Sequence, residues 1–116
     1  MGTALITDLY ELTMAQSFLE QGKTGQAVFS LFVRSLPVKR NFLVACGLET
    51  LIRQLEKFRF SSDDLAYLAG LSLFSDDFLD WLKTYRFTGD LSAIMEGTIV
   101  FQNEPLIQIE GILKDV

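Results

Sequence analysis

The 116-residue sequence contains no histidine and only one cysteine. The lack of histidine excludes His-based acid–base catalysis, Ser-His-Asp triads and zinc sites that need imidazole. The single thiol, Cys46, can form neither an intrachain disulfide nor a thiolate zinc site, and its place in the apolar run FLVACGLETL predicts a buried side chain. We therefore assign no catalytic residue to this chain and expect it to supply only part of any reactive site.

Other absences narrow the protein class further. The sequence has no glycine-rich phosphate loop of the GxxxxGK[ST] or GxGxxG type, so autonomous nucleotide binding has no support. No apolar run reaches the roughly 18 residues that span a bilayer, and a signal peptide is not recognisable, which predicts a cytoplasmic protein with no membrane partner. Ten Lys and Arg against fifteen Asp and Glu give a net charge of -5, which argues against a nucleic-acid partner.

The composition and periodicity predict one α+β domain that covers residues 1–116. Hydrophobic residues make up 49% of the chain, which is enough for one ordinary core. Helical spacing predicts helices over 7–21 and 42–58, and serine caps predict two short helices after Ser61 and Ser75. Strand patterns cover 26–34, 91–97, 98–104 and 105–111. We expect a helical layer packed on a small, mainly antiparallel sheet with strands from both ends of the chain.

The first predicted helix, ITDLYELTM and onward, carries two apolar strips. Thr7 or Asp8 is its expected N-cap, and Gly22 stands where a residue of left-handed conformation ends a helix. At about 100° per residue, the two strips are formed by Leu9, Leu12, Ala15 and Leu19, and by Tyr10, Met14 and Phe18. One strip can face the core of the domain while the other faces a partner, although a tyrosine in such a pattern is more often a core residue.

Charged side chains offer two further candidates for function. Arg34, Lys39 and Arg40 form a basic cluster around a proline-containing loop, and the ordinary interpretation is a solvated loop with Arg34 paired to a surface acid. The carboxylate pairs at 63–64 and 76–77 directly follow serine caps, so helix initiation explains them and we predict no metal site.

Three stretches follow one another in a distinctive order and spacing: ITDLYELTMAQSFLEQG, AVFSLFVRSLPVKRNFLVACGLE, and the segment from FRFSSDD to LIQIEG. Together they resemble the N-terminal region of nicotinate phosphoribosyltransferase. The resemblance implies an enzyme of NAD salvage that joins nicotinate and 5-phosphoribosyl-1-diphosphate, giving nicotinate mononucleotide and diphosphate. It also implies coupled ATP hydrolysis, Mg²⁺ on the phosphates, and a following α/β barrel that holds most of the active site and is absent here. We therefore expect the 116-residue chain alone to be inactive.

The resemblance also implies roles for individual residues. In this family the first helix reaches into the active site of the neighbouring subunit of a homodimer, so Tyr10 would lie against the pyridine ring and Asp8 would help to position the substrate. Arg34 matches a phosphate-contacting arginine of related enzymes, and Arg40 matches the arginine of the family's RNY or RNF motif. Gly47, in an AxGLE pattern, would be a close-packing position.

Two alternatives remain open from the sequence. The chain could be a non-enzymatic dimerisation or interaction domain that docks through the Tyr10 strip. It could also belong to a phosphoribosyltransferase that acts on nicotinamide or quinolinate, because base selectivity depends on residues outside this chain.

Overall fold

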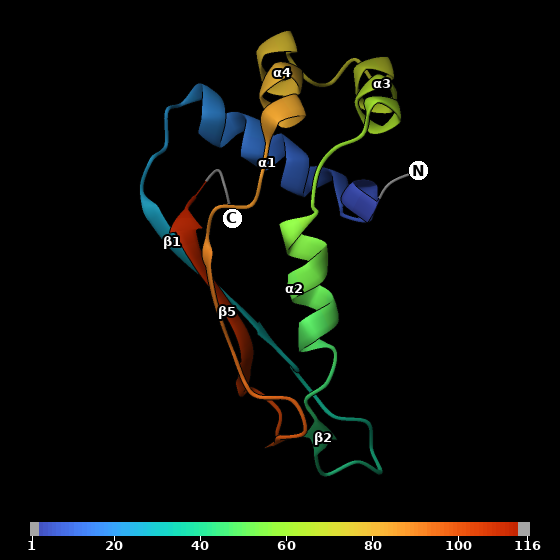
Figure 1. Cartoon of the computed structure of the whole chain (residues 1–116), viewed down its shortest axis with the longest axis vertical. Helices are drawn as coiled ribbons and strands as arrows, with labels where there is room; N and C mark the ends of the chain where they lie inside the picture. The colour runs from blue at the N-terminus through green and yellow to red at the C-terminus, as the bar shows by residue number, and fades with distance from the viewer. Residues whose placement is uncertain (1–2, 114–116) are drawn as a thin grey trace.

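The computed structural model describes residues 3–113 and shows a mixed α+β domain (Figure 1). Its helical elements are η1 Thr3–Leu5, α1 Leu9–Glu20, α2 Leu48–Glu56, α3 Ser62–Gly70 and α4 Asp76–Thr84. Its strands are β1 Gln26–Phe32, β2 Leu43–Val44, β3 Asp90–Ala93, β4 Ile99–Val100 and β5 Pro105–Ile112. The predicted α+β class is therefore confirmed.

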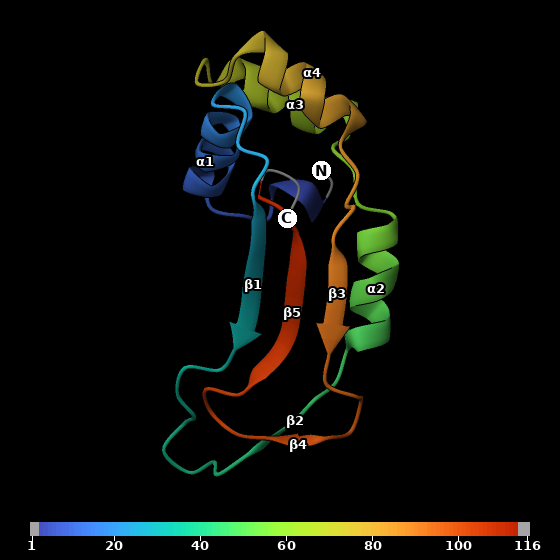
Figure 2. The same ribbon diagram turned by 90° about the vertical axis from the view of Figure 1, so that its left-hand side faces the viewer.

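Strands from both ends of the chain form the main sheet, as the sequence predicts. Its order is β1-β5-β3, and both neighbours run antiparallel to the central strand β5 (Figure 2). Phe29 of β1 pairs with Ile109 of β5, which in turn pairs with Leu91 of β3. Strand β1 ends at Phe32, so Arg34 lies in the following loop and not at the strand's end as predicted.

The predicted helix over 42–58 is wrong in its first third. Leu43 and Val44 form β2, which pairs with Val100 and Ile99 of β4 in a separate two-stranded sheet. Helix α2 begins only after Gly47, whose left-handed φ of 97° is incompatible with a continuous helix. The apolar spacing of 42–47 resembled a helix turn because a short run of this kind fits both periods.

Helix α1 begins and ends at the residues that the sequence predicts. Asp8 is the N-cap by its extended backbone. At the other end Gly22 has a φ of 61°; its N–H donates to the Leu19 carbonyl at 3.1 Å, and the Lys23 N–H donates to the Phe18 carbonyl at 2.9 Å. This pair of bonds is the Schellman arrangement, which confirms the predicted end of the helix.

Serine caps start α3 and α4, as predicted. Ser61 Oγ accepts from the Asp64 N–H at 3.2 Å, and Asp64 Oδ2 accepts from the Ser61 N–H at 3.0 Å, which makes a reciprocal capping box. Asp64 is only 1% exposed, and its Oδ2 accepts from both the N–H and the hydroxyl of Ser61. In α4, Ser75 Oγ accepts from the Phe78 N–H at 3.3 Å.

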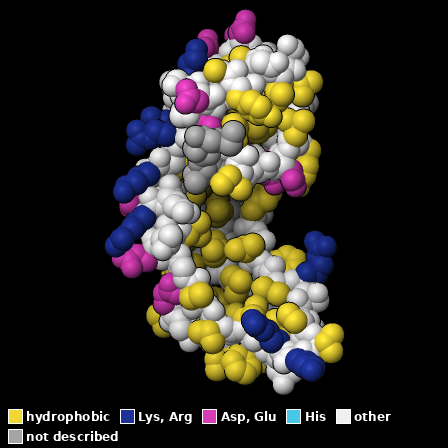
Figure 3. All heavy atoms as spheres, turned by 90° about the vertical axis from the view of Figure 1, so that its right-hand side faces the viewer, with side chains coloured by type: hydrophobic (Ala, Val, Ile, Leu, Met, Phe, Trp, Pro, Cys, Tyr) yellow, Lys and Arg dark blue, Asp and Glu magenta, His cyan; other side chains and the backbone are white. Residues whose placement is uncertain are grey.

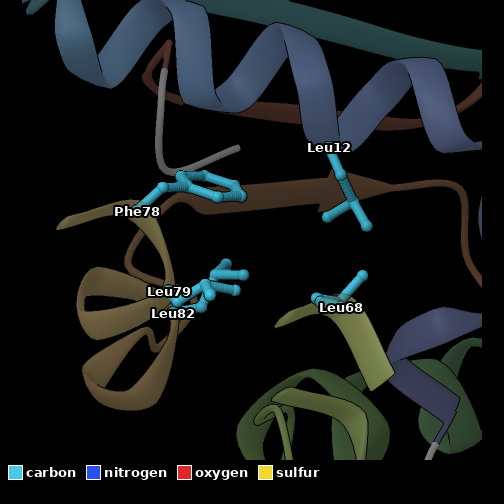
Figure 4. Packing of buried hydrophobic residues seen from close by; sticks show 5 residues of the cluster. All are labelled: Leu12, Leu68, Phe78, Leu79 and Leu82. Atoms are coloured by element: carbon cyan, nitrogen blue, oxygen red, sulfur yellow. The ribbon is translucent and has the colours of Figure 1, made fainter. Parts of the chain in front are cut away.

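The hydrophobic core lies between α1, α3 and α4 at one end of the molecule (Figures 1 and 4). Leu12 of α1 points toward the α3 and α4 side chains of this cluster, which are Leu68, Phe78, Leu79 and Leu82 (Figure 4). Phe78 is fully buried, and its ring stacks on those of Phe74 and Trp81 with centroids 5.5 and 5.6 Å apart. The sheet extends away from this helical end, with α2 alongside β3 (Figure 2).

Candidate functional site

The two apolar strips of α1 face different surroundings. Leu12 is buried, and Ala15 and Leu19 pack against the same core cluster. Leu9, assigned to this strip from its spacing, is instead 49% exposed. It is the first residue of α1 and lies outside the cluster that Leu12 joins one turn later, so helical spacing alone overestimated the length of the buried strip.

The second strip is open to solvent. Tyr10 is 58% and Met14 48% exposed, and with Phe18 they line a groove of about 490 Å³. Phe29 of β1 and Leu113 supply part of its other wall. The interpretation of Tyr10 as a core residue is therefore wrong, and an aromatic ring is available beside a groove.

Asp8 stands next to this strip with its carboxylate uncommitted to the helix. Its side chain forms no capping hydrogen bond, and its carbonyl accepts from the Glu11 N–H at 3.1 Å. The Glu11 carboxylate instead accepts a hydrogen bond from the Thr7 hydroxyl. The capping explanation of the Asp8 carboxylate thus fails, and an exposed anionic group lies two residues before Tyr10.

The basic cluster lies in the loop between β1 and β2. Arg34, Lys39 and Arg40 are all exposed, and the Arg40 N–H donates to the Pro37 carbonyl at 2.8 Å in a turn. Among residues 3–113, the ion pairs are Arg53 with Glu49 and Lys83 with Asp80, so the predicted pairing of Arg34 with a surface acid is not found there. These cations are free to meet an anion from outside the domain.

A single chain does not bring the two groups of candidates together. The groove lined by Tyr10 includes neither Arg34 nor Arg40. Helix α1 lies at one end of β1 and the arginine loop at the other (Figure 2). Figure 3 shows a hollow lined with hydrophobic side chains between the upper part of the molecule and a lower region with Lys and Arg side chains.

The surroundings of Cys46 and Gly47 differ from the prediction. Cys46 is exposed because it belongs to the loop before α2 and not to a helix interior. A Cβ on Gly47 would meet no heavy atom of residues 3–113 within 4 Å, so close packing inside this part of the chain does not require the glycine. The glycine is required because the backbone at this position has a left-handed conformation, which other residues rarely adopt.

Sequence reasoning missed a carboxylate that caps α2 from far along the chain. Glu96 Oε1 accepts from the Gly47 N–H at 2.7 Å and from the Leu48 N–H at 3.0 Å. No local motif announces this contact, because 49 residues separate Glu96 from Gly47. A second missed feature is a pocket of about 330 Å³ beside α1, whose aromatic lining is Phe58, Phe60, Trp81 and Tyr85.

The described residues lack two other types of feature. Residues 3–113 contain no group of three or more Cys, Asp or Glu side chains placed to hold a metal ion. Within the same residues, no helix has the length and apolar character needed to cross a bilayer.

The fold and its exposed side chains define a class: a small α+β domain that presents candidate binding residues on two separate surfaces. The family described as nicotinate phosphoribosyltransferase (NAPRTase) N-terminal domain matches residues 5–116, and the chain belongs to this family. The resemblance stated from the sequence motifs is therefore confirmed.

Individual relatives agree with the family match. The chain is 52% identical over 106 residues to nicotinate phosphoribosyltransferase pncB2 of Mycobacterium tuberculosis (strain H37Rv), covering 91% of this chain and 23% of that protein. It is 40% identical over 113 residues to nicotinate phosphoribosyltransferase of Bacillus subtilis (strain 168), covering 97% of this chain and 23% of that protein.

A solved structure gives the same result for the fold. The crystal structure of human nicotinic acid phosphoribosyltransferase matches with a TM-score of 0.80 and 32% sequence identity, over 94% of this chain and 23% of the human chain. The chain thus spans about a quarter of the length of each of these proteins.

Proposed function

We propose that this domain serves an enzyme that joins nicotinate to 5-phosphoribosyl-1-diphosphate, giving nicotinate mononucleotide and diphosphate in NAD salvage. The family membership carries this proposal. In the reaction the pyridine nitrogen of nicotinate forms a bond to C1 of the ribose while the diphosphate leaves. The domain contributes binding side chains to that reaction, and the remaining three quarters of such an enzyme contribute the catalytic ones. Alone, the chain has no transferase activity.

The exposed Tyr10 ring is the proposed contact for nicotinate. An electron-poor pyridine ring stacks well on a phenol face, and such aromatic pairs contribute about 0.5–1.5 kcal/mol beyond burial. Nicotinate is an anion, so the neighbouring Asp8 carboxylate would repel it if the two met directly. We therefore assign Asp8 to orienting a ribose hydroxyl or a basic neighbour.

Arg34 and Arg40 are the proposed contacts for the phosphates of 5-phosphoribosyl-1-diphosphate. The forked guanidinium group suits phosphate oxygens, and negative charge accumulates on the diphosphate as it leaves. Both residues are exposed, and neither forms an ion pair within residues 3–113.

A homodimer accounts for the separation between Tyr10 and the arginines. If α1 completes a site of the neighbouring subunit, these groups need not be close within one chain. Apolar side chains of β1 that are about half exposed, Val28, Phe29, Leu31 and Phe32, support a domain that packs against further protein.

ATP and Mg²⁺ enter the proposal only through the family resemblance. The described residues offer no carboxylate cluster that fits a metal ion, so we assign no residue of this chain to either group and derive no step through them. We also place the enzyme in the cytoplasm.

A chimera tests the proposal. This chain would replace the matching N-terminal quarter of the Mycobacterium tuberculosis relative, and formation of nicotinate mononucleotide would be measured. We expect activity in the chimera and none in the 116-residue chain. Tyr10→Ala in the chimera should raise the KM for nicotinate about tenfold, whereas Tyr10→Phe keeps the ring and should stay close to the parent.

Tyr67→Ala is the matched control, because Tyr67 on α3 is 56% exposed and lies outside the Tyr10 groove. A correctly folded chimera that turns over nicotinamide or quinolinate in preference to nicotinate would favour another base. A folded chimera without any transferase activity would favour the interaction-domain alternative.

A further inference from the structure

The loop that carries Arg34 and Arg40 is held at both ends by one distant segment. At its start, the Val33 carbonyl accepts from the Asn103 N–H at 2.8 Å. At its end, β2 pairs with β4, three residues after Arg40. Both anchors belong to the connection between β3 and β5. The position of the arginines therefore depends on how firmly that connection is fixed.

Glu96 fixes the first part of the connection. Its carboxylate binds the free N–H groups at the start of α2: Oε1 lies 2.7 Å from the Gly47 nitrogen and 3.0 Å from the Leu48 nitrogen, and Oε2 lies 3.1 Å from the former. The adjoining backbone adds two bonds, from the Gly97 N–H to the Ala45 carbonyl at 2.8 Å and from the Ala45 N–H to the Thr98 carbonyl at 2.9 Å. Hydrogen bonds from a carboxylate to backbone N–H groups are among the strong ones, particularly at a helix N-terminus.

Glu104 fixes the second part. Its Oε2 accepts from the Phe101 N–H at 2.8 Å, which closes the turn that follows β4. Within that turn Asn103 adopts a left-handed φ of 64° and directs its N–H to Val33. One carboxylate thus secures each side of β4.

We propose that Glu96 is a positioning residue for Arg34 and Arg40, with Glu104 as its counterpart on the other side of β4. This inference rests on the proposed function, since it assigns the arginines to the phosphates of 5-phosphoribosyl-1-diphosphate. Both carboxylates bind backbone N–H groups of this chain, so we assign neither of them a contact with the substrate. Without Glu96, the start of α2 loses its carboxylate bonds to the β3–β5 connection, and backbone pairing alone holds that connection there. The loop is then less firmly fixed and must be ordered again each time a phosphate binds.

Exchange of backbone amides in the full 116-residue chain tests the anchoring directly. Glu96→Ala should speed exchange at Ala45 and Arg40, whose N–H groups are hydrogen bonded in the parent. Glu49→Ala is the matched control: it removes a carboxylate from the first turn of the same helix, and in the described part of the chain that carboxylate pairs with the Arg53 side chain and not with the backbone N–H groups of α2. Unchanged exchange at both amides in the Glu96 variant would overturn the proposal.

Kinetics in the chimera test the consequence for the substrate. Glu96→Ala should raise the KM for 5-phosphoribosyl-1-diphosphate about tenfold while changing the KM for nicotinate less than about twofold. Glu96→Gln retains one acceptor oxygen and should recover part of the loss, and Glu49→Ala should match the parent.

The outcomes separate this inference from the proposed function. An inactive parent chimera counts against the function, and amide exchange then still decides whether Glu96 anchors the loop. An active chimera in which Glu96→Ala raises both KM values equally, or lowers only the melting temperature, would contradict the positioning role.

Discussion

Replacing Leu12 and Tyr10 separately by alanine should show that the two strips of α1 have different roles. Leu12 is 9% exposed and belongs to the buried cluster with Leu68 and Phe78. Truncation of a buried leucine lowers the free energy of unfolding by about 2–5 kcal/mol. Leu12 also lines the pocket of about 330 Å³, so neighbouring side chains have room to relax and the loss should not reach the upper end of this range. We therefore expect Leu12→Ala to lower the free energy of unfolding by about 3 kcal/mol.

Urea denaturation followed by circular dichroism measures this difference. With an m-value of about 1.5 kcal/mol/M, Leu12→Ala should lower the midpoint by about 2 M. Tyr10→Ala should lower it by less than about 0.5 M, because a ring that is 58% exposed buries little surface in the folded domain. Equal shifts for the two variants at a constant m-value would refute the assignment of Tyr10 to an open surface.

Three further predictions concern single positions. Gly47→Ala should lower the free energy of unfolding, measured by urea denaturation, by about 1–2 kcal/mol. The loss comes from the left-handed backbone alone, because the site has room for a Cβ. Gly25 has no positive φ, so Gly25→Ala should lower the free energy of unfolding by less. Ser61→Ala should lower the free energy of unfolding by about 1–2 kcal/mol and by more than Ser75→Ala, because the Ser61 hydroxyl also donates to the buried Asp64 carboxylate; equal losses would show that this additional bond does not stabilise the fold. In the chimera, Arg34→Ala should raise the KM for 5-phosphoribosyl-1-diphosphate about tenfold, Arg34→Lys should raise it less, and no change in either would remove Arg34 from the phosphate contacts.

Local signals in the sequence predicted those parts of the fold that local physics determines. The hydrogen bonds at the Ser61 and Ser75 caps, and those at the glycine that ends α1, join residues only a few positions apart. Local motifs were therefore sufficient to predict these helix ends. The helix over 42–58 was partly wrong because the pairing partner of Leu43 is Val100, which no local pattern reveals.

The sequence predicted only part of the candidate site. Helical spacing separated Tyr10 from Leu12, and the structure confirms that only Leu12 is buried. Spacing could not reveal that Leu9 is exposed, because burial at a helix end depends on which neighbouring elements reach it. It could not reveal Glu96 either, since a carboxylate that caps a helix 49 residues away has the sequence appearance of an ordinary surface glutamate.

Different interactions hold the two ends of this domain. Within residues 3–113, most of the buried hydrophobic residues lie in the helical end, and Val100 is the one that belongs to a strand. The arginine loop at the other end is held by backbone pairing and by carboxylates such as Glu96. Hydrogen bonds near the surface can open locally while a buried core stays intact. Substitutions in the core should therefore lower the stability of the whole domain, whereas loss of Glu96 should loosen the loop at a much smaller cost in global stability.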